Sequence, residues 1–323
     1  MSSPRLNDAA APLVGVVTVN WNSWKDTLES IGSVAASGYP DVAHIIVDNA
    51  SRDDSVEQLG LRLPQALLIA SKVNTGFAGG CNMGIAKAIE LGCRYVYLLN
   101  VDAQVRPQTL SRLVEASAEL GDTAALGSVL KYVDSGKYQF FGSRTGAKTG
   151  YPVWYDEAVD SALLDEPLIE TDFIIGAALF APTRLFNEVG LFDERFFLNF
   201  EETDWCYRVR AAGFGCFMAP GSVVMHKANG TVGSIEAPLQ TYFCLRNELL
   251  FLDKHATLAQ RLGAYRRLGF QLCRRVVKTL LARRIELRTR AIFLAARDYL
   301  LKRFGDCPDE IRTYAKLHSA GQK

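Results

Sequence analysis

Strand-like and helix-like segments alternate four times in the first 120 residues of the chain. Residues 13–19 form an unbroken apolar, β-branched run, which is typical of a strand buried on both faces of a parallel sheet. This alternation predicts an α/β layer with parallel strands. The predicted strands are residues 13–19, 44–47, 66–70 and 95–99, and the predicted helices are residues 24–36, 53–63, 81–91 and 107–120.

The pattern changes in the second half of the chain. Residues 134–170 are rich in Gly, Ser, Tyr and acidic groups and indicate an irregular insertion, and apolar order resumes at residues 173–180. Residues 238–304 look helical, since no Pro or Asn interrupts the chain from 248 to 304. With 323 residues, about two domains are expected. We place one at residues 1–235 and a basic helical region at residues 236–323.

The formal net charge of +1 hides a strong asymmetry. Residues 254–303 contain 14 Lys and Arg but only 2 Asp and Glu, out of 36 and 35 in the whole chain, so the remainder is acidic. Basic residues interleaved with apolar ones favour an amphipathic helix on an anionic membrane surface. Packing against the acidic body, or a contact in a homo-oligomer, explains the pattern equally simply. No nucleic-acid-binding motif accompanies the charge, so we expect no nucleic-acid partner.

Cysteine usage and hydropathy indicate a cytoplasmic protein. The seven cysteines are odd in number and form no CxxC pair, which disfavours a disulfide framework or a zinc site. Residues 1–11 lack the apolar core of a signal peptide. The longest strongly apolar stretch, residues 173–181, is far shorter than the ~20 residues of a membrane helix. We expect a soluble protein, or one bound peripherally to the inner face of the plasma membrane.

Polar side chains follow three of the predicted strands. Asn20 and Asn22 follow the first strand, Asp48 ends the second, and Asn100 and Asp102 follow the fourth. In open α/β sheets, ligands bind at the carboxyl ends of the strands. Asp and Asn also favour turns and helix caps, but three such groups at one edge indicate a shared site.

A glycine-rich segment, residues 74–84, follows the third strand. It contains Asn74, Gly76, Phe77 and Asn82 and is expected to form a loop before the helix at residues 81–91. Glycines let the backbone approach a ligand, and a following helix N-terminus favours anionic groups. A tight strand-to-helix turn is the plainer explanation. The segment matches neither the GxGxxG dinucleotide motif nor a P-loop.

Three carboxylates, Glu201, Glu202 and Asp204, stand among aromatic residues. A solvated acidic helix start would explain their charges but not their aromatic neighbours. Carboxylates beside apolar walls have raised pKa values, which suits proton abstraction near neutral pH. His226 closes a predicted strand, and together with Asp102 it forms a candidate site for Mg²⁺ or Mn²⁺.

Together these motifs resemble the inverting glycosyltransferase family 2, and within it the bacterial rhamnosyltransferase-type members. Their order and spacing agree over roughly residues 13–230. The resemblance implies the GT-A fold, a Rossmann-like nucleotide-diphospho-sugar transferase domain, here with a helical C-terminal extension. The matching segments are residues 16–22, 46–51, 74–84, 98–102 and 190–208.

The resemblance also assigns donor-binding roles. Asp48 would contact the base of the donor nucleotide near Asn20 and Asn22, and Asp102 would hold the metal that bridges the diphosphate. Asn100 replaces the first acid of the family's DxD-type motif, which often contacts ribose hydroxyls. A deoxyribose donor has one hydroxyl fewer, so Asn100 is compatible with a dTDP-sugar.

Two further residues complete the expected donor site. His226 matches the family's histidine downstream of the acidic motif, which can join the metal and pyrophosphate. Arg246 could meet the diphosphate from a mobile lid, although a structural salt bridge explains it as well.

The acidic run matches the family's ED-type motif, whose second position supplies the catalytic base. That position is Glu202, and Asp204 is a rival because Glu reaches one methylene farther than the commoner Asp. The implied activity is transfer of L-rhamnose from dTDP-L-rhamnose to a glycan or polyprenyl-diphosphate-linked saccharide in cell-surface polysaccharide synthesis. The alternatives are a UDP- or GDP-sugar-dependent transferase, a sugar-nucleotidyltransferase, or a non-catalytic sugar- or lipid-binding scaffold.

Overall fold

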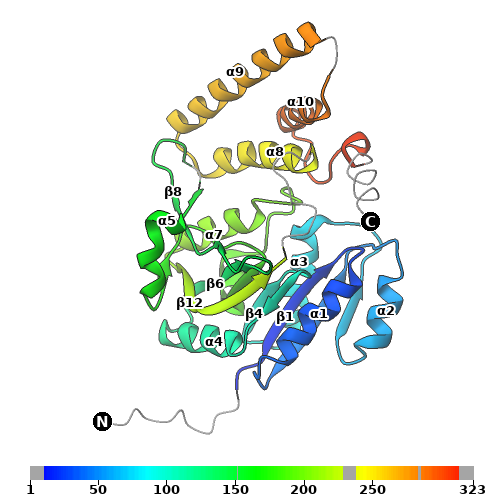
Figure 1. Cartoon of the computed structure of the whole chain (residues 1–323), viewed down its shortest axis with the longest axis vertical. Helices are drawn as coiled ribbons and strands as arrows, with labels where there is room; N and C mark the ends of the chain where they lie inside the picture. Colours follow the sequence, from blue (N-terminus) through cyan, green and yellow to red (C-terminus); the bar gives the residue numbers. More distant parts are fainter. Residues whose placement is uncertain (1–10, 151, 228–237, 283–284, 313–323) are drawn as a thin grey trace.

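The computed structural model describes residues 11–150, 152–227, 238–282 and 285–312 and shows a mixed α/β sheet with helices against it and a group of helices beyond one end (Figure 1). The strands are β1 (Val14–Asn20), β2 (Val42–Asp48), β3 (Leu67–Ala70), β4 (Tyr95–Leu99), β5 (Ala103–Val105), β6 (Ala124–Tyr132), β7 (Tyr138–Phe140), β8 (Ser143–Thr145), β9 (Pro152–Trp154), β10 (Ile169–Glu170), β11 (Ala178–Pro182) and β12 (Gly215–His226). The α-helices are α1 (Trp24–Ala35), α2 (Ser55–Arg62), α3 (Gly76–Glu90), α4 (Thr109–Glu119), α5 (Glu157–Asp160), α6 (Thr183–Val189), α7 (Glu201–Ala211), α8 (Pro238–His255), α9 (Leu258–Ala282) and α10 (Leu287–Leu300), and η1 (Ser161–Asp165) is a 3₁₀ helix.

The N-terminal half confirms the predicted parallel layer. Strands β3, β2, β1 and β4 lie side by side in that order, and all their pairings are parallel. Every residue of β4 is buried, as are all of β1 except Val19, which fits a sheet covered on both faces. The register places Asn20 of β1 opposite Asp48 of β2, so the polar residues meet at the carboxyl edge.

Helix α3 differs from its prediction, because it begins at Gly76 rather than at residue 81. Most of the glycine-rich segment is therefore the first turns of a helix and not a loop. A β-carbon at Gly80 would lie 2.7 Å from Val19 Cγ1, and one at Gly84 would collide with Val17 Cγ1. These glycines let the helix lie directly on β1, which is a packing requirement that composition alone does not distinguish from a loop.

The second half of the sheet is mixed. Strand β11 is antiparallel to both β4 and β6, and β12 runs parallel to β6. The predicted irregular insertion at residues 134–170 contains only short elements, β7 to β10 with α5 and η1. The far end of β12 pairs with β5, so that His226 lies opposite Ala103, next to Asp102. This pairing brings residues 124 positions apart into one site.

The C-terminal helices confirm the predicted helical extension. Helix α8 lies nearest the sheet, α10 packs on α8, and α9 is the outermost element (Figure 1). Tyr242 of α8 donates a hydrogen bond to Asp298 of α10 at 2.9 Å within a buried cluster that includes Phe243 and Ala295. Within the described part of the chain, no helix combines the length and the hydrophobicity needed to cross a membrane.

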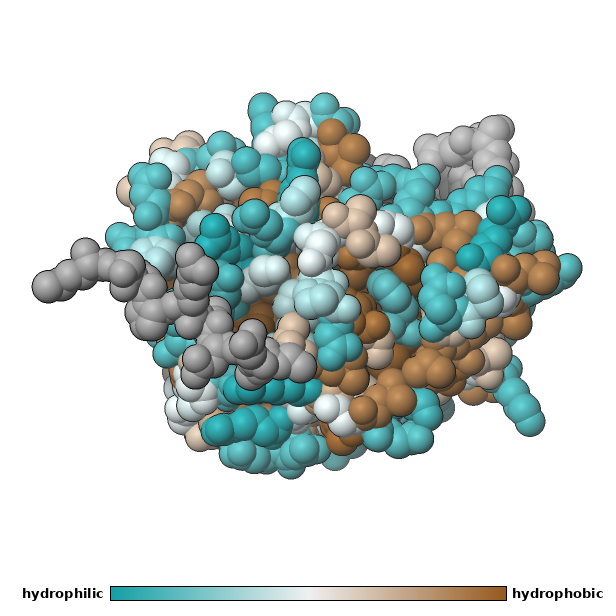
Figure 2. All heavy atoms as spheres, turned by 90° about the horizontal axis from the view of Figure 1, so that it is seen from below, coloured by the Kyte–Doolittle hydropathy of each residue, from teal (hydrophilic) through white to brown (hydrophobic). Residues whose placement is uncertain are grey.

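Figure 2 shows the face of the molecule opposite the helical end. Seen from below, it mixes hydrophilic and hydrophobic side chains (Figure 2). All seven cysteines lie within the described residues and are free thiols, and five of them are buried.

Candidate active site

The carboxyl ends of β1 and β2 are joined by a buried polar network. Asn20 donates from Nδ2 to Asp48 Oδ1 at 2.7 Å and accepts from Thr27 Oγ1 at 2.9 Å. The backbone N–H of Ser51 donates to Asp48 Oδ2 at 3.0 Å, and Ser51 Oγ accepts from the N–H of Asn22 at 2.8 Å. Because Asn20 and Asp48 are almost fully buried, they also shape the loops that would meet a nucleotide base.

Asn49 connects this edge to the start of α3. Its Nδ2 donates to Gly76 O at 2.8 Å and to Asn74 Oδ1 at 3.2 Å, and its Oδ1 accepts from the N–H of Thr75 at 2.9 Å. Asn74 Oδ1 also accepts from the N–H of Gly76 at 2.8 Å. The sequence identified Asn49 only as a neighbour of Asp48, whereas in the structure it orients the helix N-terminus.

Asp102 and His226 meet, as the sequence predicted. His226 Nε2 lies 3.0 Å from Asp102 Oδ1, and both side chains are mostly buried. On its other side, His226 Nδ1 lies 2.8 Å from Gln139 Oε1 of β7. Gln139 was not a predicted site residue, because the insertion that contains it carries no recognisable motif.

The pair fits a divalent cation. A neutral imidazole has one N–H. Both ring nitrogens of His226 nevertheless face oxygen atoms, Nδ1 the Oε1 of Gln139 and Nε2 the Oδ1 of Asp102. With Nδ1–H donated to Gln139, Nε2 keeps a lone pair beside the Asp102 carboxylate, and these two groups could together ligate a divalent cation. Metal-bound histidines commonly donate their second N–H to a neighbouring acceptor in this way. Among the described residues there is no cluster of three or more His, Cys, Asp or Glu, so a metal here would need oxygens from its substrate.

Glu201 and Glu202 open helix α7 and point toward the start of α3. Glu202 Oε1 lies 3.5 Å from the N–H of Gly176, which donates to it. A β-carbon at Gly176 would lie 2.9 Å from Phe77 Cε1, so Phe77 and Glu202 flank this glycine. Next along the chain, Ala177 accepts at 3.0 Å from the N–H of Asn100. The acidic motif therefore lies beside the end of β4 that carries Asn100 and Asp102.

The two adjacent glutamates have perturbed titration. Burial and the neighbouring charge of Glu202 raise the pKa of Glu201 well above its ordinary value, and burial also raises the pKa of Glu202. The Oε2 atom of each is buried and has no donor among the described residues. Two such carboxylates cannot both be ionised cheaply, and the stronger upward pKa shift falls on Glu201. Glu202 is therefore the more readily ionised of the two.

Asp204, the rival base, lies in a buried ion-pair network. Its Oδ1 is 2.6 Å from Lys254 Nζ and 2.8 Å from His255 Nε2, and its Oδ2 accepts from Arg208 Nε at 2.9 Å. Burial alone would raise the pKa of Asp204, but the hydrogen bonds from His255 and Lys254 outweigh it and lower the pKa. A fully buried carboxylate bound by a lysine, an arginine and a histidine is a poor proton acceptor and a good link between α7 and α8.

Arg246 makes structural contacts in the described chain, which agrees with the structural alternative that the sequence left open beside diphosphate binding. It is fully buried and donates to Gly305 O at 2.6 Å and to Phe196 O at 3.1 Å. Its neighbour Asn247 donates from Nδ2 to the carbonyls of Phe196, Leu198 and Asn199 at 2.7 to 2.8 Å. The pair therefore holds the segment before Glu201, and a backbone-binding role of this kind has no sequence signature.

That segment is conformationally strained. Phe197, Asn199 and Phe200 have φ values of 64°, 69° and 75°, which non-glycine residues rarely adopt. Such strain persists only where surrounding contacts impose it, and it clusters at functional sites. The Asn247 hydrogen bonds provide that constraint directly before the catalytic candidates.

Asn82 and Asn22 hold neighbouring segments together. Asn82 exchanges hydrogen bonds with the backbone of Phe192 and donates to Glu194 Oε1 at 2.9 Å, so it fastens α3 to the stretch before the acidic motif. Asn22 Oδ1 accepts from the N–H of Arg52 at 2.7 Å. Both therefore contribute to the loops around the site.

Several known proteins are similar to this chain in sequence. The sequence model of glycosyl transferase family 2 matches residues 15–176. An N-acetylglucosaminyl-diphospho-decaprenol L-rhamnosyltransferase of Mycobacterium tuberculosis is 24% identical over 235 residues, covering 67% of this chain and 76% of that protein. The dTDP-rhamnosyl transferase RfbF of Shigella flexneri is 22% identical, with 65% and 71% covered.

Solved structures share the fold. A mannosyltransferase from Pyrobaculum calidifontis, in complex with GDP-Man and Mn²⁺, superposes with a TM-score of 0.58 at 15% identity, covering 90% of this chain and 88% of that one. GalNAc-T7 with UDP, GalNAc and Mn²⁺ gives a TM-score of 0.60 at 15% identity, covering 76% of this chain and 48% of that one. At this identity the likeness concerns the GT-A fold alone.

Proposed function

The chain belongs to glycosyl transferase family 2, and from that membership we propose that it transfers L-rhamnose from dTDP-L-rhamnose to a polyprenyl-diphosphate-linked saccharide in cell-surface polysaccharide synthesis. Glycosyl transfer itself follows from the family. The finer proposal is supported by the two relatives named as rhamnosyltransferases, one of which is named for a diphospho-decaprenol-linked acceptor. The observation that carries it is the meeting of Asp102 and His226 beside the Glu201–Glu202 pair.

The donor nucleotide lies, in this proposal, along the carboxyl ends of β1, β2 and β4. Asp48, held by Asn20 and Ser51, would border the base at the end of β2. Asn100 stands where an acid would contact a ribose hydroxyl, and an amide suits a deoxyribose that lacks one hydroxyl. Phe77 and the N-terminal turn of α3 border the sugar and diphosphate side.

Asp102 and His226 would hold Mg²⁺ or Mn²⁺, with Gln139 orienting the imidazole. When bound, the metal would supply positive charge to the diphosphate as it leaves. The solved mannosyltransferase and GalNAc-T7 contain Mn²⁺ together with a nucleotide or nucleotide sugar, which supports a divalent cofactor here.

Glu202 acts as the general base in a single displacement. Its carboxylate takes the proton of the acceptor hydroxyl while that oxygen forms a bond to the anomeric carbon of the donor sugar. The bond from this carbon to the diphosphate oxygen breaks, and its electron pair leaves with the nucleotide. Attack opposite the leaving group inverts the anomeric configuration. Glu201 keeps its own proton and orients the Glu202 carboxylate.

We further propose that residues 1–235 perform catalysis and that residues 236–323 keep the enzyme at the cytoplasmic face of the membrane. The clustering of exposed apolar and basic side chains on α9 supports this division. A homo-oligomer contact through the same helices is the competing arrangement.

The test is a transfer assay with dTDP-rhamnose, UDP-sugars and GDP-sugars, each with Mg²⁺, Mn²⁺ or EDTA, using a polyprenyl-diphosphate-linked acceptor. We expect turnover with dTDP-rhamnose, its loss in EDTA, and an inverted anomeric centre by NMR. Glu202→Gln should lower turnover by roughly 10²–10⁴-fold, the usual contribution of a general base, while donor binding stays close to wild type.

Preference for UDP- or GDP-sugars would reject the rhamnose donor but keep the transferase. Metal-independent turnover would reject the role of Asp102 and His226. Formation of a nucleotide sugar from a sugar phosphate would instead identify a nucleotidyltransferase, and binding without turnover would identify a scaffold.

A further inference from the structure

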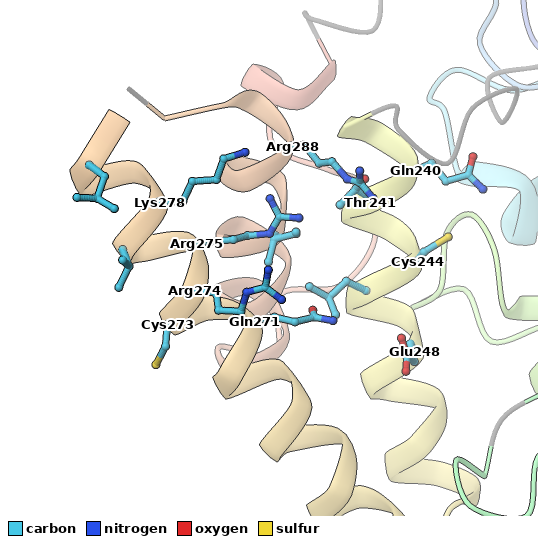
Figure 3. Close-up of a pocket in the computed structure, with 14 residues that line it drawn as sticks. Gln240, Thr241, Cys244, Glu248, Gln271, Cys273, Arg274, Arg275, Lys278 and Arg288 are labelled. Atoms are coloured by element: carbon cyan, nitrogen blue, oxygen red, sulfur yellow. The ribbon is translucent and has the colours of Figure 1, made fainter. Parts of the chain in front are cut away.

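A large groove lies among the C-terminal helices, on the side of α8 that faces α9. Its volume is about 980 Å³, and helices α8, α9 and α10 all contribute to its walls. Figure 3 shows basic side chains of α9 reaching across it toward α8. Four cations line the groove: Arg274, Arg275, Lys278 and Arg288.

Two of these cations have few contacts of their own. Among the described residues, neither Arg274 nor Arg288 forms an ion pair, whereas Lys278 pairs with Glu286 at 3.0 Å and Arg275 donates to Thr289 at 2.9 Å. Arg288 Nε is buried and has no hydrogen-bond partner there. Buried guanidinium nitrogens normally find acceptors, so the groove has unused capacity to bind an anion.

The α8 wall of the groove also carries unused polar atoms. Gln240 Oε1 and Thr241 Oγ1 are buried without partners among the described residues. Among the described residues that line the groove, Glu248 is the only carboxylate, and burial raises its pKa, which weakens its repulsion of an anionic ligand. The groove therefore carries a net positive charge, and several of its buried polar atoms have no hydrogen-bond partner among the described residues.

Apolar side chains continue from the groove onto the open surface of α9. Val277 and Leu281 belong to the groove lining, and they are 55% and 81% exposed. Leu280 and Ile285, close to them in sequence, are 71% and 58% exposed. A small water-soluble anion would leave these apolar side chains exposed, whereas an anion with a hydrocarbon tail would cover them.

We propose that this groove binds the diphosphate of a polyprenyl-diphosphate lipid, with Arg274 and Arg288 contacting the phosphates and the apolar residues of α9 contacting the first part of the tail. This proposal rests on the proposed transfer to a lipid-linked acceptor and specifies where that acceptor is held. Each phosphate carries a negative charge, which matches the excess of cations lining the groove. Guanidinium groups bind phosphate oxygens through paired hydrogen bonds, which suits two arginines.

The position of the groove fits delivery of an acceptor sugar to the base. Cys244 of α8 is part of the lining, and burial together with the charges of Glu248, Glu202 and Glu201 raises the pKa of its thiol to about 11. The catalytic carboxylates thus lie within electrostatic reach of the α8 wall. Further along the same helix, Asn247 contacts the segment before Glu201.

The experiment measures binding of the full-length protein to phosphatidylcholine vesicles by flotation. The vesicles contain undecaprenyl diphosphate, or phosphatidylglycerol at the same total charge, or neither. We expect tightest binding to the undecaprenyl diphosphate vesicles. Arg274→Gln/Arg288→Gln should weaken that binding by roughly tenfold or more, because two charge-assisted contacts are lost.

The matched control is Arg266→Gln/Arg267→Gln, which removes the same amount of charge from two positions of α9 outside the groove lining. It should bind within about twofold of wild type, since it loses only screened surface charge. Equal weakening by both double variants, or equal binding of the phosphatidylglycerol vesicles, would show general attraction to an anionic surface and overturn the proposal.

Measuring hydrolysis of the donor distinguishes a failure of the groove proposal from a failure of the proposed function. Hydrolysis of dTDP-rhamnose by water should be unchanged in both double variants, because the donor site is intact. Normal lipid binding without any sugar transfer would reject the proposed function alone. Transfer to the lipid-linked acceptor with unchanged KM in Arg274→Gln/Arg288→Gln would reject the groove alone.

Discussion

In the proposed mechanism, the chemistry at the level of single residues depends on how two adjacent glutamates divide one proton. Glu201 is almost fully buried and Glu202 only partly so, yet both have raised pKa values because burial opposes their charge. The stronger effect falls on Glu201, which leaves Glu202 to ionise first. Their different roles therefore follow from their surroundings and not from their residue type.

We expect Glu201→Gln to keep activity within about tenfold of wild type, because an amide donates the same hydrogen bond as a protonated carboxyl group. In the wild type, kcat/KM should rise with pH through a pKa above that of an ordinary glutamate, as Glu202 loses its proton. In the variant, the rise of kcat/KM at low pH should follow the titration of one group, Glu202, because Glu201 no longer ionises. A pH profile of kcat/KM checks this, and a loss as severe as that of Glu202→Gln would make Glu201 the base.

Asp204→Asn should destabilise the fold. The variant leaves Lys254, His255 and Arg208 without their shared carboxylate, which for a buried ion pair costs about 3–5 kcal/mol. The folded pKa of Asp204 is lowered, so its contribution is fully present above the unfolded pKa near 3.8 and is lost as pH falls through the folded pKa. Urea unfolding at pH 7 and at pH 3 measures the difference.

The matched control is Glu188→Gln, which removes an exposed ion pair with Arg184. Its free energy of unfolding should change by about 0.5 kcal/mol or less. A change for Asp204→Asn no larger than that of the control would contradict the structural role of Asp204 and renew its claim to be the base.

Residues in recognisable motifs at strand ends were predictable from the sequence. Residues that only hold another side chain or a backbone segment in place were not. Asp102 and His226 were paired from sequence because strand ends converge, and the structure brings them together. Gln139 and Asn247 escaped notice, since they bind an imidazole and three carbonyls that only the fold brings near. The role of Arg246 stayed open between diphosphate binding and a structural contact, because a buried arginine and a ligand-binding arginine look alike in sequence.

At the scale of elements, α3 shows why the strand and helix order was predictable but one boundary was not. Hydrophobic periodicity located every element of the parallel layer, since each must bury one face. The glycines of residues 76–84 read as a loop by propensity, whereas packing against β1 makes them helical. Tertiary contact thus overrides the cost of glycine in a helix, about 1 kcal/mol per residue.

Gly84→Ala should therefore destabilise the protein although alanine is the better helix former. Its β-carbon would collide with Val17 Cγ1 of β1, and overpacking of this kind costs about 1–3 kcal/mol. Gly32→Ala in α1 is the control, because nothing lies within 4 Å of its new β-carbon. That variant should gain about 0.4–1 kcal/mol. Urea unfolding of both proteins compares them, and equal stability would mean that α3 does not lie this close to β1.

The whole molecule separates charge between two ends. The helical extension carries most of the excess basic charge, and the sheet with its surrounding helices carries the acidic excess. Sequence predicted this separation, but not that α9 would leave a groove between itself and α8. The groove depends on the distance between the helices, and the hydrophobic periodicity of the sequence predicts helices but not their separation.

Ionic strength should distinguish the two ends. Raising NaCl from about 0.05 to about 0.5 M shortens the screening length severalfold and weakens attraction between α9 and anionic vesicles. We expect transfer to a lipid-linked acceptor in such vesicles to fall steeply, while hydrolysis of the donor changes little. Parallel decline of both rates would mean that the basic end does not contribute to meeting the acceptor.

Helix α8 has one further consequence for how this enzyme can change. One face of the helix borders the cationic groove, and the other carries Asn247, which fixes the backbone before Glu201. A shift of α8 that reshapes the groove would therefore also move the backbone before Glu201. If the groove binds the acceptor lipid, changing acceptor specificity through α8 would disturb the proposed base Glu202. New acceptor specificities should therefore arise by substitutions on α9 and α10, while α8 keeps its position.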